Sequence, residues 1–148
     1  MARRPRDEDE RSDARERALG YLYEAETKAI APTDVLAAQV ITPDALTTML
    51  VTGVERNGQR IDDLVAAHAK GWTLARMPSI DRNVLRLGTF ELLERPDVDV
   101  PVVIDEAVAL AVRFSTDDSG RFVNGVLAAI ADTVRGGSAR HPATPTEP

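Results

Sequence analysis

The chain has 148 residues with no cysteine and two histidines, and its 18 basic and 24 acidic residues give a formal net charge of −6. This length suits a single domain with one hydrophobic core, and the lack of cysteine excludes a disulfide framework, a thiolate zinc site and a cysteine nucleophile. The acidic balance argues against a uniformly basic surface that coats duplex nucleic acid, but it permits a local basic patch.

The N-terminal segment predicts a charged arm followed by the first helix. Residues 1–11 are rich in charge and cannot bury apolar surface, so we expect a flexible arm. Asp13 and Glu16 have the spacing of a capping box, and the apolar stripe after them predicts a helix over about residues 13–30. No secretory signal is visible, and no apolar run approaches the roughly 18–20 residues of a membrane span. We therefore expect a cytoplasmic protein without a membrane segment.

Prolines and glycines divide the next part of the chain. A short helix is expected over residues 35–40, after a Pro-Thr-Asp break. Thr42 is expected to cap a longer helical segment that has Pro43 in its first turn. Gly53 and Gly58 lie inside that segment, so it can form one helix or two.

The following segment predicts a connector and two helices. Residues 71–78 (GWTLARMP) are expected to form a packed connector, and Ser79 to cap a helix that ends before Pro96. Pro101 opens the next element, which begins like a strand with Val-Val-Ile. From Ile104, however, apolar residues repeat at i, i+3, i+4 and i+7, which indicates a helix.

The last predicted helix contains an Asn-Gly pair within its apolar stripe. We expect a turn over Ser115–Gly120 and a helix to about Arg135, because nothing around Asn124-Gly125 alternates as the strands of a hairpin do. The glycine of that pair is expected to let another helix approach closely. Residues 136–148 have no packing pattern and are expected to form a disordered tail. The predicted fold class is all-α, a compact bundle of six or seven helices in one domain over residues 12–135.

The sequence contains no P-loop, GxGxxG, HExxH or GxSxG motif. The carboxylate pairs Asp105-Glu106 and Asp117-Asp118 are expected at helix N-termini, where negative charge stabilises the helix dipole. His68 lies on a helical face and is expected to be a packing residue with satisfied hydrogen bonds rather than a ligand. Because no nucleophile, base and orienting group converge, we predict that the chain is not an enzyme and has no cofactor or metal site.

Three separated stretches resemble the NusB family of transcription antitermination factors. Ala14–Glu26 (ARERALGYLYEAE) resembles the first helix of the family. Ser79–Phe114 resembles its central helix pair, with the runs RNVLRL and PVVIDEA, and Asp117–Ile130 resembles its closing helix with FVNGVL. The resemblance covers about residues 14–132 in order and spacing. It implies an all-α fold of two packed helical sub-bundles.

The resemblance also implies a function in the transcription of ribosomal RNA. Family members bind the boxA element of ribosomal RNA leader and spacer transcripts together with the small-subunit ribosomal protein NusE. The complex acts on the RNA polymerase elongation complex through other Nus factors, so that transcription continues through terminators. The fold also occurs as a domain of an rRNA cytosine methyltransferase, but no such domain follows the closing helix, so we expect the standalone factor.

Candidate RNA contacts lie near the predicted start of the first helix. Arg15 is expected where a cation is unfavourable with the helix dipole, so a nearby polyanion would explain its placement. The alternative is an ion pair with Asp13 or Glu16. Arg11 and the arginines of the arm are further candidates. Six arginines and six acidic residues balance over residues 1–17, however, where many family members have a basic run.

A second set of candidates lies at the start of the last helix. Phe122 fits the apolar stripe as a core residue, whereas the resemblance implies that it stacks on an RNA base while Arg121 contacts a phosphate. Base–aromatic stacking is worth about 1–3 kcal/mol, so one ring can matter. Asp118 and Ser119 match the turn nearest the RNA in the family. We hypothesise that the charge of Asp118 restrains RNA affinity.

Two residues match the NusE-binding face of the family. Tyr23 has core packing as its alternative role, and Asp81 has capping of its own helix. Arg76, Arg82 and Arg86 surround this single acid, and we interpret them as a second phosphate-binding patch.

A rival function is a helical protein-interaction or dimerisation module with weak or lost RNA binding. The balanced charge of the N-terminal arm favours this rival. A homodimer that hides part of the RNA face is one form of it.

Overall fold

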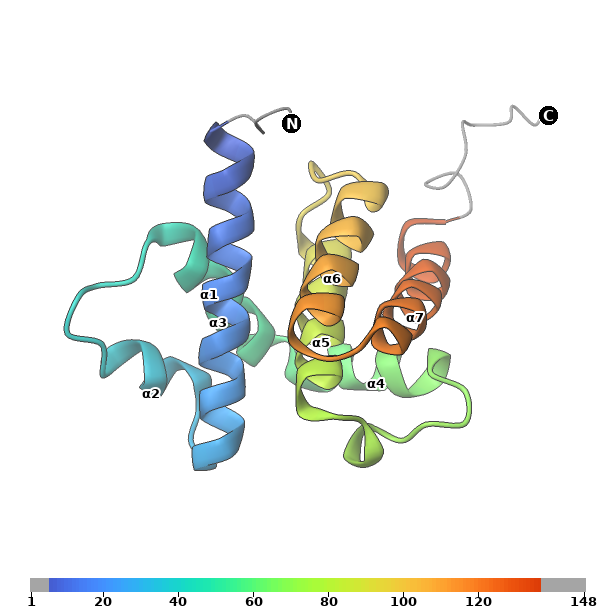
Figure 1. Cartoon of the computed structure of the whole chain (residues 1–148), viewed down its shortest axis with the longest axis horizontal. Helices are drawn as coiled ribbons and strands as arrows, with labels where there is room; N and C mark the ends of the chain where they lie inside the picture. Colours follow the sequence, from blue (N-terminus) through green and yellow to red (C-terminus); the bar gives the residue numbers. More distant parts are fainter. Residues whose placement is uncertain (1–5, 137–148) are drawn as a thin grey trace. The chain divides into compact units, whose positions relative to one another are not determined.

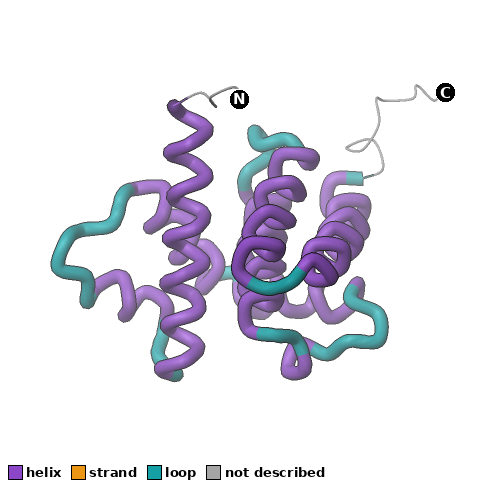
Figure 2. Tube along the Cα trace, in the orientation of Figure 1, coloured by secondary structure: helices purple, strands orange, loops and turns teal. Residues whose placement is uncertain are grey.

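The computed structural model describes residues 6–136, which form seven α-helices and one short 3-10 helix, with no strand in this range (Figure 1 and Figure 2). The predicted all-α class and the predicted number of helices are confirmed. The chain divides after Arg56 into two compact units. Most of the predicted tail and the first five residues of the predicted arm lie outside the described residues. Among the described helices, none is long and apolar enough to cross a membrane.

The N-terminal unit consists of three helices, and α1 packs on both of the others. The helices are α1 (Arg6–Lys28), α2 (Pro32–Ala37) and α3 (Ala45–Arg56). Each contributes apolar side chains that are almost fully buried. Among them are Ala18, Leu19 and Leu22 of α1, Val35 of α2, and Leu50 and Val51 of α3.

The first helix begins at Arg6, so the predicted start near residue 13 was wrong. Asp13 and Glu16 lie inside α1 and do not cap it. The acidic run at residues 7–10 falls in the first turns, where negative charge is favourable with the helix dipole. The charged sequence that suggested a flexible arm therefore also suits a helix N-terminus, and residues 6–11 are helical.

Asp44 caps α3, which corrects the prediction that Thr42 is the cap. Its carboxylate accepts a hydrogen bond from the Thr47 amide at 3.0 Å and one from the Thr47 hydroxyl at 2.6 Å. It also forms an ion pair with Arg17 of α1 at 2.9 Å. Partial burial raises the pKa of the Asp44 carboxyl, but the hydrogen bonds from Thr47 and Arg17 outweigh that effect and lower the pKa below its ordinary value.

The long predicted segment forms two helices. Asn57 separates α3 from α4 (Gly58–His68), whereas Gly53 lies within α3. The preceding helix α2 starts at Pro32 and ends at Ala37, so the short helix predicted over residues 35–40 is displaced by about three residues. Proline at the first helical position is pre-organised for a helix start, which explains the displacement.

In the C-terminal unit, α5 packs against α4, α6 and α7, and α6 also packs against α7 (Figure 1). Besides α4, the elements are η1 (Leu74–Arg76), α5 (Ser79–Glu94), α6 (Val100–Phe114) and α7 (Asp117–Arg135). The predicted inner face of α5 is confirmed, because Val84, Leu85 and Leu87 are almost fully buried. The helical interpretation of the Val-Val-Ile segment is also confirmed.

Helix starts in this unit differ from the prediction in three places. Ser79 is the first residue of α5 and not its cap, since Pro78 holds the cap position. Asp105-Glu106 lies beyond the first turn of α6, whereas Asp117-Asp118 lies in the first turn of α7 as predicted. Thr116 caps α7, so the turn before this helix is shorter than the predicted Ser115–Gly120 turn.

Two glycines permit close helix packing, and neither is the predicted one. A Cβ at Gly120 would lie 2.6 Å from Val112 Cγ2 of α6, and one at Gly88 would lie 2.7 Å from Leu127 Cδ1 of α7. A Cβ at Gly125 would meet nothing within 4 Å. The prediction that Gly125 allows a close approach was therefore wrong, because this face of α7 is exposed.

Candidate nucleic-acid interface

The N-terminal turn of α7 gathers several predicted site residues. Thr116 Oγ1 accepts a hydrogen bond from the Ser119 amide at 3.0 Å, which fixes the start of the helix. Asp118 and Arg121 are 85% and 75% exposed and form an ion pair with each other. The next residue, Phe122, is half-buried. This turn therefore presents a cation, a carboxylate and an aromatic ring together.

Phe122 contacts Trp72, a residue that the sequence analysis assigned to a packed connector. Their ring centroids lie 6.1 Å apart with an interplanar angle of 60°. Trp72 is 49% exposed, so the pair forms an aromatic surface rather than part of the closed core. Phe122 is therefore not a fully buried core residue, and the connector that carries Trp72 is not fully packed. The clue in the sequence was that Trp72 is the chain's one tryptophan and lies outside every apolar stripe.

A chain of side-chain hydrogen bonds connects this turn to the start of α5. The Ser119 hydroxyl donates to Asp81 Oδ2 at 2.8 Å, and the hydroxyls of Ser115 and Thr116 each lie 3.0 Å from Ser119 Oγ. Asp81 is 4% exposed, and its Oδ1 is buried without a hydrogen-bond partner. Asp81 was predicted to lie on the NusE-binding face, with capping of its own helix as the alternative. Its buried carboxylate accepts from Ser119 and so holds the start of α7.

A pocket of about 210 Å³ lies where the connector, α5 and α7 meet. Its apolar wall comes from Trp72, Met77 and Phe122, and its polar groups come from Asp81, Thr116, Asp118 and Ser119. Pockets for small molecules usually measure about 300–1,000 Å³, so this one is small for a whole cofactor or nucleotide. It has room for one planar group.

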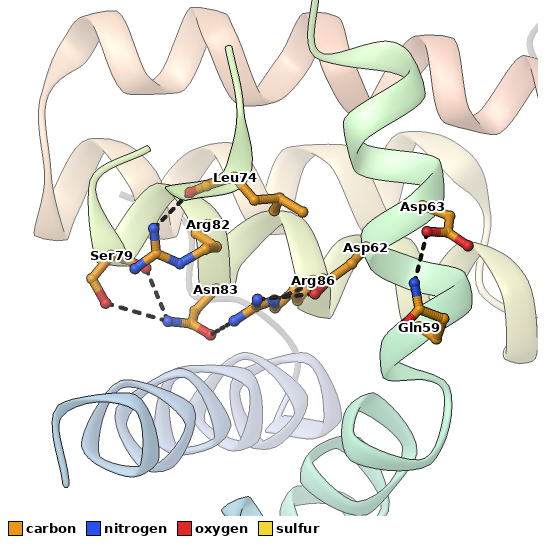
Figure 3. Close-up of polar contacts among 8 residues, drawn as sticks. All are labelled: Gln59, Asp62, Asp63, Leu74, Ser79, Arg82, Asn83 and Arg86. Carbon is orange, nitrogen blue, oxygen red and sulfur yellow. Dashed lines mark hydrogen bonds and ion pairs between the residues drawn. The ribbon is translucent and has the colours of Figure 1, made fainter. Parts of the chain in front are cut away.

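The predicted arginine patch around Asp81 does not consist of free cations. Arg82 Nη1 donates to the carbonyls of Leu74 and Met77 at 2.7 and 2.8 Å. Arg86 forms a two-pronged ion pair with Asp62 at 2.9 and 3.1 Å (Figure 3).

Within that predicted patch, Arg86 has one further partner and Arg76 differs from the other two. Arg86 also donates to Asn83 Oδ1 at 3.3 Å (Figure 3). Arg76, in η1, is exposed. The connector and α4 supply partners for Arg82 and Arg86, so these two cations are already paired, and the phosphate contact predicted for them stays a prediction.

The candidate residues in the N-terminal unit differ in how exposed their side chains are. Arg15 is 4% exposed and lies in the third turn of α1, so the argument from the helix start was wrong. Arg11 is exposed and lies beside Arg17 and Asp44 in a shallow depression. Tyr23 is 44% exposed, which rules out the core-packing alternative.

The described residues contain no group of three or more His, Cys, Asp or Glu side chains that could hold a metal ion. His68 has partners for both ring nitrogens, as predicted. Its Nδ1 lies 2.7 Å from the Leu64 carbonyl oxygen and its Nε2 lies 2.8 Å from Thr133 Oγ1.

A family model described as the NusB family matches residues 12–132. The chain belongs to the NusB family. The match spans both compact units and includes the Trp72 connector and the start of α7.

Curated relatives agree with this assignment. The chain is 55% identical over 128 residues to the transcription antitermination protein NusB of Saccharopolyspora erythraea, with 82% of this chain and 86% of that protein covered. It is 47% identical over 131 residues to the NusB protein of Beutenbergia cavernae, with 79% and 86% covered.

Solved NusB structures share the fold. Thermotoga maritima NusB aligns with a TM-score of 0.75 at 32% identity, and the alignment covers 88% of this chain and 93% of that one. A structure of the antitermination factors NusB and NusE in complex with double-stranded RNA aligns with a TM-score of 0.71 at 28% identity, covering 83% and 96%.

Proposed function

We propose that this chain is a transcription antitermination factor that acts in the cytoplasm on ribosomal RNA operons. It binds the boxA element of leader and spacer transcripts together with the ribosomal protein NusE. Through other Nus factors, the complex engages the RNA polymerase elongation complex and lets it read through terminators. The observation that carries this proposal is the NusB family match over residues 12–132, together with a structural neighbour that contains both NusE and RNA.

The start of α7 supplies the RNA-binding chemistry in this proposal. Arg121 holds a phosphate while the exposed part of the Phe122 ring stacks on an unpaired base. Single-stranded RNA is recognised in this way, by stacking on aromatic rings and by hydrogen bonds to base edges. Ser119 and Asp118 complete the turn, and the Asp118 charge weakens the attraction of Arg121 for phosphate because the two side chains are paired.

In this proposal, exposed cations outside α7 bind further phosphates. We assign this role to Arg11 and Arg76, which are exposed. We assign a structural role to the other three candidates. Arg82 and Arg86 bond to neighbouring groups, and Arg15 is buried. Tyr23 offers an exposed aromatic surface for NusE. None of these roles requires catalysis.

A titration over a salt series tests this function. Fluorescently labelled boxA RNA and a scrambled RNA of equal length are mixed with the chain, with and without NusE. We expect a preference for boxA that NusE strengthens, and a salt slope of about −0.7 per phosphate contact in single-stranded RNA. Equal affinity for both RNAs, even with NusE, would contradict the proposal. If NusE then still binds, the rival function as a protein-interaction module is favoured.

A further inference from the structure

The aromatic surface beside Phe122 includes a residue with no role in the function proposed above. Trp72 is about half exposed although it is large and apolar, and it lies on the connector before α5. Its ring centroid lies 6.1 Å from that of Phe122, and the two rings are tilted by 60°. Because the side chain is 49% exposed, part of the indole ring is open to contact with another ring.

The small pocket beside these rings indicates which class of ligand group fits there. Its wall is aromatic and its volume of about 210 Å³ suits one ring system. Asp81 and Asp118 contribute carboxylates to the lining, so a phosphate would be repelled there. A nucleobase, which is planar and uncharged, fits both the shape and the charge.

A buried acceptor gives a second, independent observation. Asp81 is among the residues that line the pocket, and its Oδ1 is buried without a hydrogen-bond donor, although its Oδ2 accepts from Ser119. A buried polar group without a partner is uncommon and costly in a native protein. Carboxylates accept hydrogen bonds but cannot donate them, so the site favours a base edge that carries an amino group.

We propose that Trp72 and Phe122 together form the binding pocket for one RNA base, and that the base presents an exocyclic amino group toward Asp81. Cytosine, adenine and guanine carry such a group, whereas both exocyclic groups of uracil are acceptors. Trp72 is then a specificity-determining residue for RNA. This inference deepens the proposed function and rests on it.

The single tryptophan makes the proposal directly measurable. Labelling the full-length chain with 5-fluorotryptophan places one ¹⁹F nucleus in the molecule, at position 72. We expect the ¹⁹F resonance to shift when boxA RNA is added, with or without NusE, and to stay unchanged with NusE alone. Binding is followed in parallel through the anisotropy of labelled RNA.

The two readouts separate the possible failures. RNA that binds by anisotropy without moving the ¹⁹F resonance overturns the base pocket and leaves the proposed function standing. A resonance that moves with NusE alone and not with RNA overturns the pocket in favour of a protein contact. If boxA binds no better than scrambled RNA, the proposed function fails, and the base pocket fails with it.

Variants provide a second test. Trp72→Ala is expected to weaken boxA binding by about 5- to 100-fold, the range of base–aromatic stacking, and Trp72→Phe to retain most of the affinity. Phe114→Ala is the matched control, because Phe114 is 42% exposed and does not line the pocket. Equal losses for Trp72→Ala and Phe114→Ala would overturn the proposal. Circular dichroism checks folding, and if Trp72→Ala unfolds, the ¹⁹F experiment decides.

A base scan tests the amino-group preference. Each amino-bearing base of the boxA RNA is replaced in turn by uracil, and one replacement is expected to weaken binding to the native chain but not to Trp72→Ala. If the two proteins respond alike at every position, the pocket does not read a base.

Discussion

The two ends of α7 use the same residue type in opposite ways. At the N-terminal end, Arg121 is exposed and forms an ion pair with its neighbour Asp118. At the C-terminal end, Arg135 donates to four main-chain carbonyls at 2.6–3.0 Å, and burial lowers its pKa from the ordinary value. These carbonyls belong to Glu91, Leu92, Arg95 and Val98.

This difference separates stability from function along one helix. The carbonyls bound by Arg135 come from the last turn of α5 and the loop after it. Those of Glu91 and Arg95 also accept main-chain amides, whereas Pro96 has no amide hydrogen to donate to the Leu92 carbonyl. The N-terminal end presents an exposed cation and a half-buried ring, and it lies beside Asp81 of α5, whose buried Oδ1 has no hydrogen-bond partner. The side chains that complete the fold and those that we propose to bind RNA are thus about four turns apart.

Arg135→Ala should have the largest effect on stability. We expect the free energy of unfolding to fall by about 2–3 kcal/mol, because several charge-assisted hydrogen bonds are lost and the Leu92 carbonyl loses its side-chain donor. Urea denaturation measures this change. Arg121→Ala is the matched control at the other end of α7, and a surface ion pair of its kind is worth at most about 1 kcal/mol. Equal losses of unfolding free energy in both variants would contradict the separation of stability from function along α7.

Phe122→Ala should have the largest effect on RNA binding. The loss of stacking should weaken the affinity for boxA RNA by about 1–3 kcal/mol, as measured by titration with labelled RNA. Because the ring is half-buried, we expect a smaller loss of stability than for a core phenylalanine, for which truncation costs about 3–5 kcal/mol. A variant that unfolds at room temperature would restore the interpretation of Phe122 as a core residue.

Two glycines in α7 should respond to alanine with opposite signs. Gly120→Ala should lower the free energy of unfolding by about 1–3 kcal/mol, because the new methyl group meets Val112 of α6 at 2.6 Å. Gly125→Ala should raise it by up to about 1 kcal/mol, since the site is open and alanine is the better helix former. Thermal unfolding of both variants tests this, and a destabilising Gly125→Ala would show that its exposed face is covered in solution.

Asp118→Asn should have the smallest effect, and it should act on binding. Removing the charge eliminates repulsion of phosphate and releases Arg121, so RNA affinity should rise by about 0.5–1 kcal/mol at low salt. The gain should shrink as salt increases, because both side chains are exposed. Unchanged or weaker binding in a titration at low salt would remove the idea that Asp118 restrains affinity.

Helix identity could be predicted from the sequence better than helix ends. Repeating apolar positions on α5 and α6 identified both helices and their buried faces correctly. The start of α3 was missed because Thr42 and Asp44 are both common capping residues, and only the structure shows that Asp44 accepts from the Thr47 amide. Helix periodicity reports which face is buried, but a cap depends on which side chain reaches the first amides.

The site was predictable only in part, for the same reason. The family resemblance located the start of α7, but Phe122 and Trp72 are 50 positions apart in the sequence and no local pattern joins them. Arg82 and Arg86 looked like a basic patch because their partners lie elsewhere, at Leu74 and Asp62. A single sequence shows where charges are, whereas only the fold shows which of them are already paired.

The central claim is that RNA binds at the N-terminal end of α7 and not at its C-terminal end. Hydrogen–deuterium exchange of the full-length chain with NusE, before and after addition of boxA RNA, tests it most directly. We expect RNA to slow exchange in peptides that cover residues 70–76 and 116–123, and to leave residues 130–135 unchanged. Protection confined to residues 130–135, or absent from α7 while the RNA is bound, would contradict the claim.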